Sequence, residues 1–374
     1  MRKEELFSND EYIFEVNQQI YSESDGSEFV STPDYWSFEN LGLCFNCNND
    51  TILDDSYRMG KFINLVGKFK KNVPEVDIKS KIVHLSQDEL KLLKAISDIF
   101  FFYDSVCENL TFHPYVDAVM RLSSEVLGDI IEQSHIFDNS PAKGKTLDFP
   151  SYFKLITALN SYMRIINSTD VANSIDNIKR KVRKNNTSIN HHFQSLLKNH
   201  ARLLVIRIDL GYQARLKECN RLRHVDLLDV VNHRKCFFAG IKKRYPDSIG
   251  YVWKLEFAPK KGFHYHLILY FNGEQLRADG AISLALANLW KDIAGERRGV
   301  SFLCNLHKDK YAHPAIGVIH YKDKEKIKNF KFMAEYLSKN DLFSSIKADK
   351  LHTMGKSQVN STKEKRGRPR TSTL

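Results

Sequence analysis

Two histidines separated by one residue are the strongest chemical signal in the sequence. His264 and His266 lie in a run of aromatic and aliphatic residues, 263–271, that follows Gly262 and ends at an Asn-Gly turn. Such a run between turn residues is typical of a buried β-strand. Because side chains two positions apart on a strand point to the same face, the pattern predicts that both imidazoles reach into one site.

A carboxylate precedes the two histidines at a useful distance. Glu256 belongs to the apolar run 249–257, and a hairpin through residues 258–262 would bring it alongside His264 and His266. Two imidazoles and one carboxylate form a mixed nitrogen and oxygen donor set for a divalent metal ion. The residues also allow a pair of hydrogen-bonded core histidines with no metal, because a His-x-His pattern alone is short and frequently matches by chance.

A tyrosine and a lysine near the end of the chain could supply a nucleophile and a cation. Tyr336 and Lys339 lie three positions apart in residues 323–339, whose pattern is helical, so they share one helix face. A tyrosine can attack a phosphodiester and hold the DNA end as a phosphotyrosine when a cation or metal stabilises the developing charge. The alternative for Tyr336 is ordinary aromatic packing, since the chain contains 16 tyrosines.

The elements that must position these residues alternate in an order typical of an α+β domain. From residue 201 onward the pattern predicts the order β-α-β-β-α-β-β-α. The strands are expected at 203–209, 249–257, 263–271, 300–306 and 316–321. The first helical region ends near residue 244, and the other two helices cover 281–293 and 323–339. This order favours an antiparallel sheet of the split βαβ kind with helices on one face.

Four segments are predicted along the whole chain. Residues 1–56 form an acidic, loosely ordered segment, 57–190 a helical domain, 195–345 the domain with the sheet and the candidate site, and 346–374 a basic tail. Within the helical domain we expect helices at 115–133, 152–166 and 171–182, and the polar residues 185–188 indicate the boundary to the next domain.

The charge distribution points to nucleic acid as a partner. The net charge is +11, yet residues 1–55 contain thirteen acidic and two basic residues, a charge of −11, so the rest of the chain carries +22. Such a basic body is the electrostatic footprint of nucleic-acid binding, although basic runs are also found on ordinary solvated surfaces.

The sequence offers no membrane span or secretion signal. No apolar run reaches the roughly 18 to 20 residues of a membrane span, and the first residues are polar and acidic, which predicts a cytoplasmic protein with no membrane partner. Of six cysteines, only Cys44 and Cys47 have the spacing of a metal or redox pair. We interpret them as two cysteines without a shared function. The alternative is a metal site that His84 or His113 would complete.

Together these motifs resemble those of a known enzyme class. An upstream glutamate, a Gly-x-His-x-His strand and a later Tyr-x-x-Lys helix, in this order over roughly residues 200–345, resemble the HUH endonucleases. They are most similar to the rolling-circle replication initiators of filamentous phages and prophages, the YagK/YfjJ-like group. The resemblance implies a bacterial host cell and an antiparallel-sheet HUH nuclease domain.

The resemblance assigns roles residue by residue. It implies that His264, His266 and Glu256 bind Mg²⁺ or Mn²⁺, that Tyr336 is the nucleophile, and that Lys339 contacts the phosphate or the metal site. A single motif tyrosine implies a single-tyrosine enzyme, with Tyr321 a weaker second candidate. The implied substrate is single-stranded or hairpin origin DNA, nicked and rejoined through a 5′-phosphotyrosine, with a host helicase for unwinding and no nucleotide cofactor.

The basic tail contains a motif of a different kind. Arg366, Gly367, Arg368, Pro369 and Arg370 resemble an AT-hook, in which arginines enter the narrow minor groove of AT-rich duplex DNA. A disordered basic terminus is the alternative.

Two other functions stay open for the chain as a whole. One is a noncatalytic, sequence-specific DNA-binding regulator with the same fold and charge. The other is a His₂-carboxylate oxygenase that uses Fe²⁺, which leaves Tyr336, Lys339 and the basic surface without a role.

Overall fold

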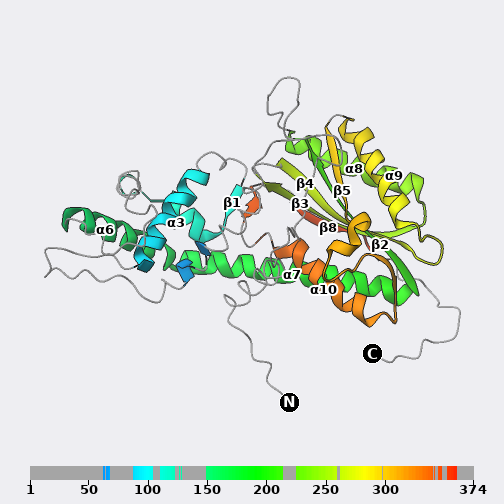
Figure 1. Ribbon diagram of the computed structural model, residues 1–374, viewed down its shortest axis with the longest axis horizontal. Helices are drawn as coiled ribbons and strands as arrows, with labels where there is room; N and C mark the ends of the chain where they lie inside the picture. Colours follow the sequence, from blue (N-terminus) through cyan, green and yellow to red (C-terminus); the bar gives the residue numbers. More distant parts are fainter. Residues whose placement is uncertain are drawn as a thin grey trace, which may run out of the picture. The chain divides into compact units, whose positions relative to one another are not determined.

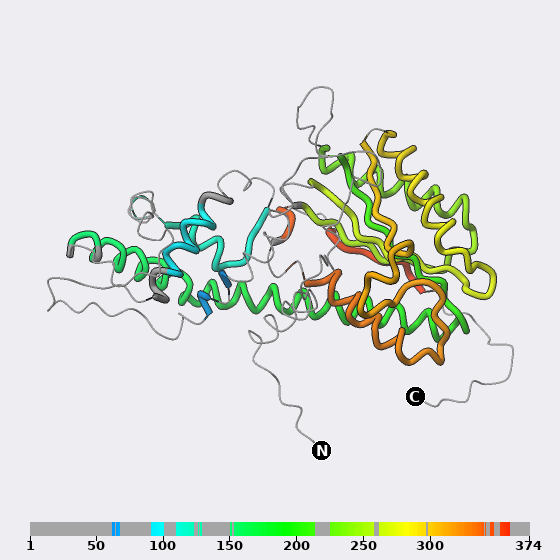
Figure 2. The backbone as a smooth tube through the Cα atoms, viewed as in Figure 1, coloured from blue at the N-terminus to red at the C-terminus, as the bar shows by residue number. Residues whose placement is uncertain are grey.

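The chain divides into two compact units. One comprises Met1–Arg183 with Lys339–Lys350, and the other comprises Lys184–Ser338 with Leu351–Leu374. The computed structural model describes residues 62–63, 65–67, 87–103, 110–122, 126, 128, 149–213, 225–258, 262–296, 298–339, 341, 344–347 and 352–359 (Figures 1 and 2). The expected acidic segment, the pair Cys44 and Cys47, and the AT-hook residues lie outside them.

The first unit is mainly helical in its described part. It contains α3 (Gln87–Tyr103), α4 (Pro114–Met120), α6 (Phe149–Ile166) and the start of α7 (Thr169–Asn199), with a small antiparallel pair of β1 (Leu110–Phe112) and β7 (Ser344–Ile346). The buried Tyr162 hydroxyl on α6 donates a hydrogen bond of 2.9 Å to the carbonyl of Tyr115, which ties α6 to α4.

Helix α7 passes through the predicted boundary at residues 185–188, and the two units divide beside these residues, at Arg183 and Lys184. It runs without interruption for 31 residues and carries these polar residues in its interior. Ile189, Phe193 and Leu196 follow at helical spacing and are all buried, so one face of the helix continues into a hydrophobic core. The weak helix preference of Asn, Thr and Ser, under about 1 kcal/mol each, is too small to end a helix that buries such a face.

The second unit is built on an antiparallel sheet. Its elements follow in the predicted order as β2 (Arg202–Tyr212), α8 (Leu227–Arg244), β3 (Ser248–Ala258), β4 (Gly262–Asn272), α9 (Asp279–Ala294), β5 (Gly299–Leu303), β6 (Gly317–His320) and α10 (Lys324–Lys339). The strand order is β5-β2-β4-β3-β8. Both β5 and β6 pair with the edge of β2 that faces away from β4, β5 along residues 208–212 and β6 along residues 202–205. Because β2 and β3 are each antiparallel to β4, they run parallel to each other with β4 inserted between them. This is the predicted split βαβ arrangement, and the α+β class is confirmed.

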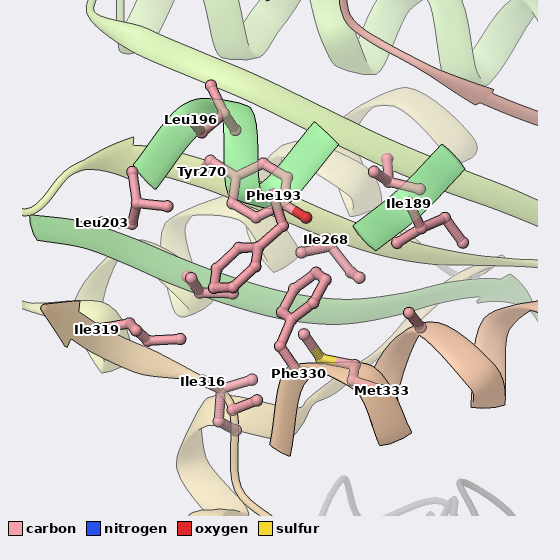
Figure 3. Packing of buried hydrophobic residues seen from close by; sticks show 14 of the residues in the cluster. Ile189, Phe193, Leu196, Leu203, Ile268, Tyr270, Ile316, Ile319, Phe330 and Met333 are labelled. Carbon is pink, nitrogen blue, oxygen red and sulfur yellow. The ribbon is translucent and has the colours of Figure 1, made fainter. Parts of the chain in front are cut away.

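Helices cover both faces of this sheet, not one face as predicted. On one face Tyr265 of β4 donates from its hydroxyl to Val230 of α8, and α9 packs against β2 and β5 (Figure 1). On the other face α7 and α10 pack together over the sheet, with the Phe193 and Phe330 rings stacked 3.8 Å apart (Figure 3). Strands β2 and β4 are therefore buried on both sides, which explains why they lack the alternation of a half-exposed strand.

Two segments near the end of the sheet differ from the prediction. The strand expected to reach residue 306 ends at Leu303 and turns into the 3₁₀ helix η5 (Cys304–Lys310). Asn305 accounts for the turn, because its buried side chain accepts from the Arg207 N–H and donates to the Val205 carbonyl. In addition, the predicted basic tail contributes a strand, β8 (Met354–Lys356), which pairs with β3.

Among the described residues, no helix combines the length and the apolar composition needed to cross a membrane.

Candidate metal centre

The β3–β4 hairpin brings the three predicted ligand residues together. Glu256 and His264 are directly opposite each other in the antiparallel register, and His266 follows two positions along the same face. Gly262 opens β4 with a φ of 68°, a left-handed conformation that favours glycine, so the chain can reverse tightly just before the first histidine. The predicted hairpin is confirmed.

Both histidines direct the same ring nitrogen toward the glutamate. The Nε2 atoms of His264 and His266 lie 3.6 and 3.2 Å from Oε2 of Glu256, and all three residues are buried. One ligand atom from each residue lies within 4.8 Å of the other two. The two imidazole rings are perpendicular, with centroids 5.1 Å apart, so neither blocks the other from a shared point.

The opposite nitrogen of each ring is held by an oxygen atom. Nδ1 of His264 lies 3.1 Å from the Gly262 carbonyl, and Nδ1 of His266 lies 2.8 Å from Oδ1 of the fully buried Asp209. Metal-binding histidines nearly always donate their second N–H to a carbonyl or carboxylate, which fixes the tautomer and aims the other nitrogen at the metal. The residues present thus fit a divalent ion held by His264, His266 and Glu256.

Charge interactions in this centre are strong because it is buried. Burial by itself lowers the pKa of His266, but the carboxylates of Asp209 and Glu256 raise it to about 9 in the metal-free site. Burial conversely raises the pKa values of Asp209 and Glu256, and the neighbouring imidazoles lower them below their ordinary values. In the absence of metal the centre is a cationic imidazole between two carboxylates, and a bound cation can replace that proton.

Helix α10 places Tyr336 beside the histidines. Its half-buried ring lies 5.7 Å from the ring of His266, with an edge-on angle of 86°. The guanidinium carbon of Arg207 lies 4.5 Å from the centroid of the same tyrosine ring. Lys339 follows one turn later as the half-buried last residue of α10, where the chain enters the first unit. Its contact with a phosphate stays a prediction.

Three charged residues on this face of the sheet received no role from the sequence. Asp209 holds His266, Arg207 contacts Tyr336, and Lys254, only 1% exposed, lies between Val252 and Glu256 on β3 as the register partner of His266. Lysine, arginine and aspartate are almost never fully buried without partners. Charged residues alternating with Ile, Leu and Trp inside predicted buried strands were therefore the signal that could have identified them.

All residues of this candidate centre lie in the part of the chain that matches a known protein family. The model of the YagK/YfjJ C-terminal domain matches residues 167–357, just over half of the chain. The chain belongs to the YagK/YfjJ C-terminal domain family. The YagK/YfjJ domain begins just before α7 and ends after β8, so it includes the hairpin with the three ligand residues, Asp209 on β2, and Tyr336 on α10. No curated protein and no solved structure shows detectable similarity to the chain.

Proposed function

We propose that this protein is a metal-dependent DNA nicking and joining enzyme that starts rolling-circle replication of phage, prophage or plasmid DNA. The observation that carries the proposal is the position of Tyr336, whose ring lies against His266 of the candidate metal centre. A noncatalytic DNA-binding protein has no need for a phenol next to a buried His₂Glu donor set.

The reaction follows from the chemistry of a phenol next to a scissile phosphate. The Tyr336 oxygen attacks the phosphorus of a single-stranded phosphodiester and loses its proton to solvent. The bond from phosphorus to the 3′-oxygen breaks, that oxygen takes up a proton, and the 5′ end remains attached as a phosphotyrosine. Attack by a 3′-hydroxyl on the phosphotyrosine reverses these steps, so joining requires no nucleotide cofactor.

His264, His266 and Glu256 would hold the ion. Bound there, Mg²⁺ or Mn²⁺ would supply Lewis-acid polarisation of the phosphate oxygens. The protein side chains have separate tasks: Asp209 holds the His266 ring in place, and α10 keeps the phenol at the edge of the centre. Lys339, one turn from Tyr336, would add a positive charge for the phosphate.

The proposal extends to partners that the chemistry requires. The attacked strand must be accessible, so origin DNA would be single-stranded or extruded as a hairpin. Duplex unwinding would come from a host helicase in the bacterial cytoplasm. The tail residues 366–370 would hold the enzyme on AT-rich duplex near the origin.

A covalent-adduct experiment tests the proposal. The full-length protein is incubated with a 5′- and 3′-labelled library of single-stranded oligonucleotides in Mg²⁺ or Mn²⁺, and adducts are detected on denaturing gels. We expect a labelled adduct whose modified peptide contains Tyr336 by mass spectrometry.

Matched variants separate the assignments. Tyr336→Phe should abolish the adduct, whereas Tyr321→Phe should leave it unchanged, as expected of a single-tyrosine enzyme. His264→Ala should abolish the metal dependence together with the activity. Salt-dependent DNA binding by the wild type with no adduct in either metal would instead favour the noncatalytic regulator.

A further inference from the structure

Arg207 is a buried cation whose surroundings do not satisfy its hydrogen-bonding groups. Its side chain is only 6% exposed in the middle of β2, an interior strand of the sheet next to β4. The Nη2 atom lies 3.9 Å from Oδ2 of Asp209, which is an ion pair but too long for a hydrogen bond. Within the described residues, Nε and Nη2 have no hydrogen-bond acceptor.

Such an arrangement is costly for folding alone. A buried donor without an acceptor loses its bonds to water and gains none in the protein, and the loss is larger when the group is charged. A planar guanidinium stays charged under all ordinary conditions, so it cannot escape the cost by losing a proton. The Asp209 carboxylate does not remove the cost, because its Oδ2 is beyond hydrogen-bond distance from Arg207 and its Oδ1 is paired with His266 at 2.8 Å.

The neighbours of Arg207 indicate what kind of ligand would satisfy it. Its guanidinium carbon lies 4.5 Å from the centroid of the Tyr336 ring, and Tyr336 in turn lies against His266. The phenol of Tyr311 and the thiol of Cys304 also lie close enough to interact electrostatically with it. The Tyr336 ring is therefore in contact with both Arg207 and the candidate metal centre.

We propose that Arg207 is a phosphate-binding residue of the active site, which takes non-bridging oxygens of the scissile phosphodiester and then of the phosphotyrosine. This inference rests on the proposed nicking reaction for its substrate, but the phosphate-binding property can be measured without any reaction. Guanidinium N–H groups pair with phosphate oxygens in a fixed planar geometry that a lysine ammonium cannot reproduce. Arg207 and the metal ligands would hold the phosphate from two sides, with Tyr336 between them.

The first test uses inorganic phosphate as the probe. With Mn²⁺ bound to the full-length protein, phosphate at the site should be broadened in ³¹P spectra by the nearby paramagnetic ion. We expect Arg207→Lys to weaken this phosphate binding at least tenfold, Tyr336→Phe to preserve it, and the Mn²⁺ affinity of both variants to stay within about threefold of the wild type. Equal phosphate binding by Arg207→Lys and the wild type overturns the proposal.

The second test uses adduct formation with the single-stranded library. Arg207→Lys keeps the positive charge but loses the planar donor pair, and should slow the adduct about 100-fold, the scale on which one transition-state donor acts. Arg207→Met removes the charge as well and should also shift the pH profile to higher pH, because the phenolate loses a close cation. A merely structural role would lower Tm and Mn²⁺ affinity together with the rate and leave the pH profile in place.

Two controls keep the outcomes distinct. If Arg207→Lys does not fold, the ³¹P broadening in the wild type still decides, because phosphate that binds away from the Mn²⁺ site contradicts the proposal. If the wild type forms no adduct but binds phosphate in an Arg207-dependent way, the nicking reaction fails while the phosphate site stands.

Discussion

At the residue scale, the candidate centre is defined by which nitrogen of each histidine is tied down. Asp209 and the Gly262 carbonyl occupy the Nδ1 atoms, and this leaves both Nε2 atoms directed at Glu256. The same three-residue motif without these contacts could have been a pair of core histidines. The second layer of oxygen atoms is therefore what makes a metal-binding role chemically reasonable.

Asp209→Asn tests this second layer directly. An amide oxygen can still accept from the imidazole, but it removes the negative charge that makes the ligand more basic. We expect Mn²⁺ affinity to fall by about 10- to 100-fold, as is common for such outer partners, with titration calorimetry as the measurement. Asp309→Asn, at an exposed carboxylate in η5, is the matched control and should not change the affinity; an equal loss in both variants would contradict the assignment.

The proton on His266 makes metal binding depend on pH. Its pKa is raised to about 9 in the metal-free site, chiefly because the neighbouring carboxylates outweigh the effect of burial. A metal ion must displace this proton, so apparent affinity should rise about tenfold per pH unit from pH 7 toward 9. Calorimetry in buffers of different ionisation enthalpy should detect close to one proton released per ion at pH 7. Release of no proton would show that His266 is already neutral.

The same raised pKa predicts how the metal-free protein responds to pH. The folded-state value lies above the ordinary value of 6.5, so this interaction stabilises the fold fully below about pH 6.5 and is lost as the pH rises through about 9. We expect Tm measured in EDTA to fall over that range and to fall less when saturating Mn²⁺ is present. The same fall with and without Mn²⁺ would exclude His266 as its source.

At the element scale, α10 matters because it positions Tyr336, and α7 positions α10. The contact is the stacked pair of Phe193 and Phe330, both essentially without exposure (Figure 3). Phe330→Ala should lower the free energy of unfolding by about 3 kcal/mol through the lost burial and the cavity it leaves. Phe332→Ala on the same helix, at a side chain 37% exposed, should cost about 1 kcal/mol or less. Denaturant titration measures both, and similar losses would contradict this account of how α10 is held.

A groove between α7 and β8 is the element-scale candidate for contact with the flanking DNA. It has a volume of about 620 Å³ and is lined by Lys198, Lys356 and polar side chains that include Ser195 and Gln358. Lys356 pairs with Val252, four positions before Glu256, so the groove lies about 13 Å along β3 from this candidate metal ligand.

Charge reversal tests the groove as a DNA-binding surface. Lys198→Glu with Lys356→Glu should weaken single-stranded DNA binding and reduce the slope of log affinity against log salt by about 0.7 for each phosphate that the protein no longer neutralises. Lys243→Glu, on α8 at the opposite face of the sheet, is the comparison and should leave the slope unchanged. An unchanged slope in the double variant would remove the groove from the DNA path.

At the scale of the whole molecule, the three candidate ligand residues, Asp209, Arg207 and Tyr336 all belong to the second unit. The boundary between the units falls within α7, at Arg183 and Lys184, and not in a linker. A fragment that starts at residue 167 keeps the complete helix, whereas one that starts at 184 removes its first half.

We expect the fragment 167–374 to fold and to bind Mn²⁺ with wild-type affinity. We also expect it to form adducts with single-stranded DNA, since it retains the YagK/YfjJ domain. Circular dichroism, calorimetry and the adduct assay test these points, and a fragment starting at 184 should be less stable because half of α7 is removed. Loss of Mn²⁺ binding in the longer fragment would show that the first unit is required for the centre. If the first unit serves origin recognition or helicase recruitment, its removal should abolish only replication in cells.

The local patterns of the sequence were sufficient for the order of elements in the second unit and for bringing together the three residues of the candidate metal centre. Alternation along a strand places His264 and His266 on one face, and a short turn with Gly262 makes the pairing with Glu256 almost unavoidable. Helical spacing likewise placed Tyr336 on α10. Each of these inferences depends on residues close together in the chain.

Tertiary structure alone decided what those residues meet. Asp209 and Arg207 lie more than 50 positions before His266 and come close to it only because β2 pairs with β4, which puts Asp209 opposite His266. The second helical layer over the sheet and the entry of β8 from the expected tail are also long-range packing outcomes. Periodicity reports which face of an element is apolar, but not which partner covers it, because that choice depends on burial summed over the whole domain. The Tyr336 and His266 contact, on which the proposed chemistry depends, is one such outcome.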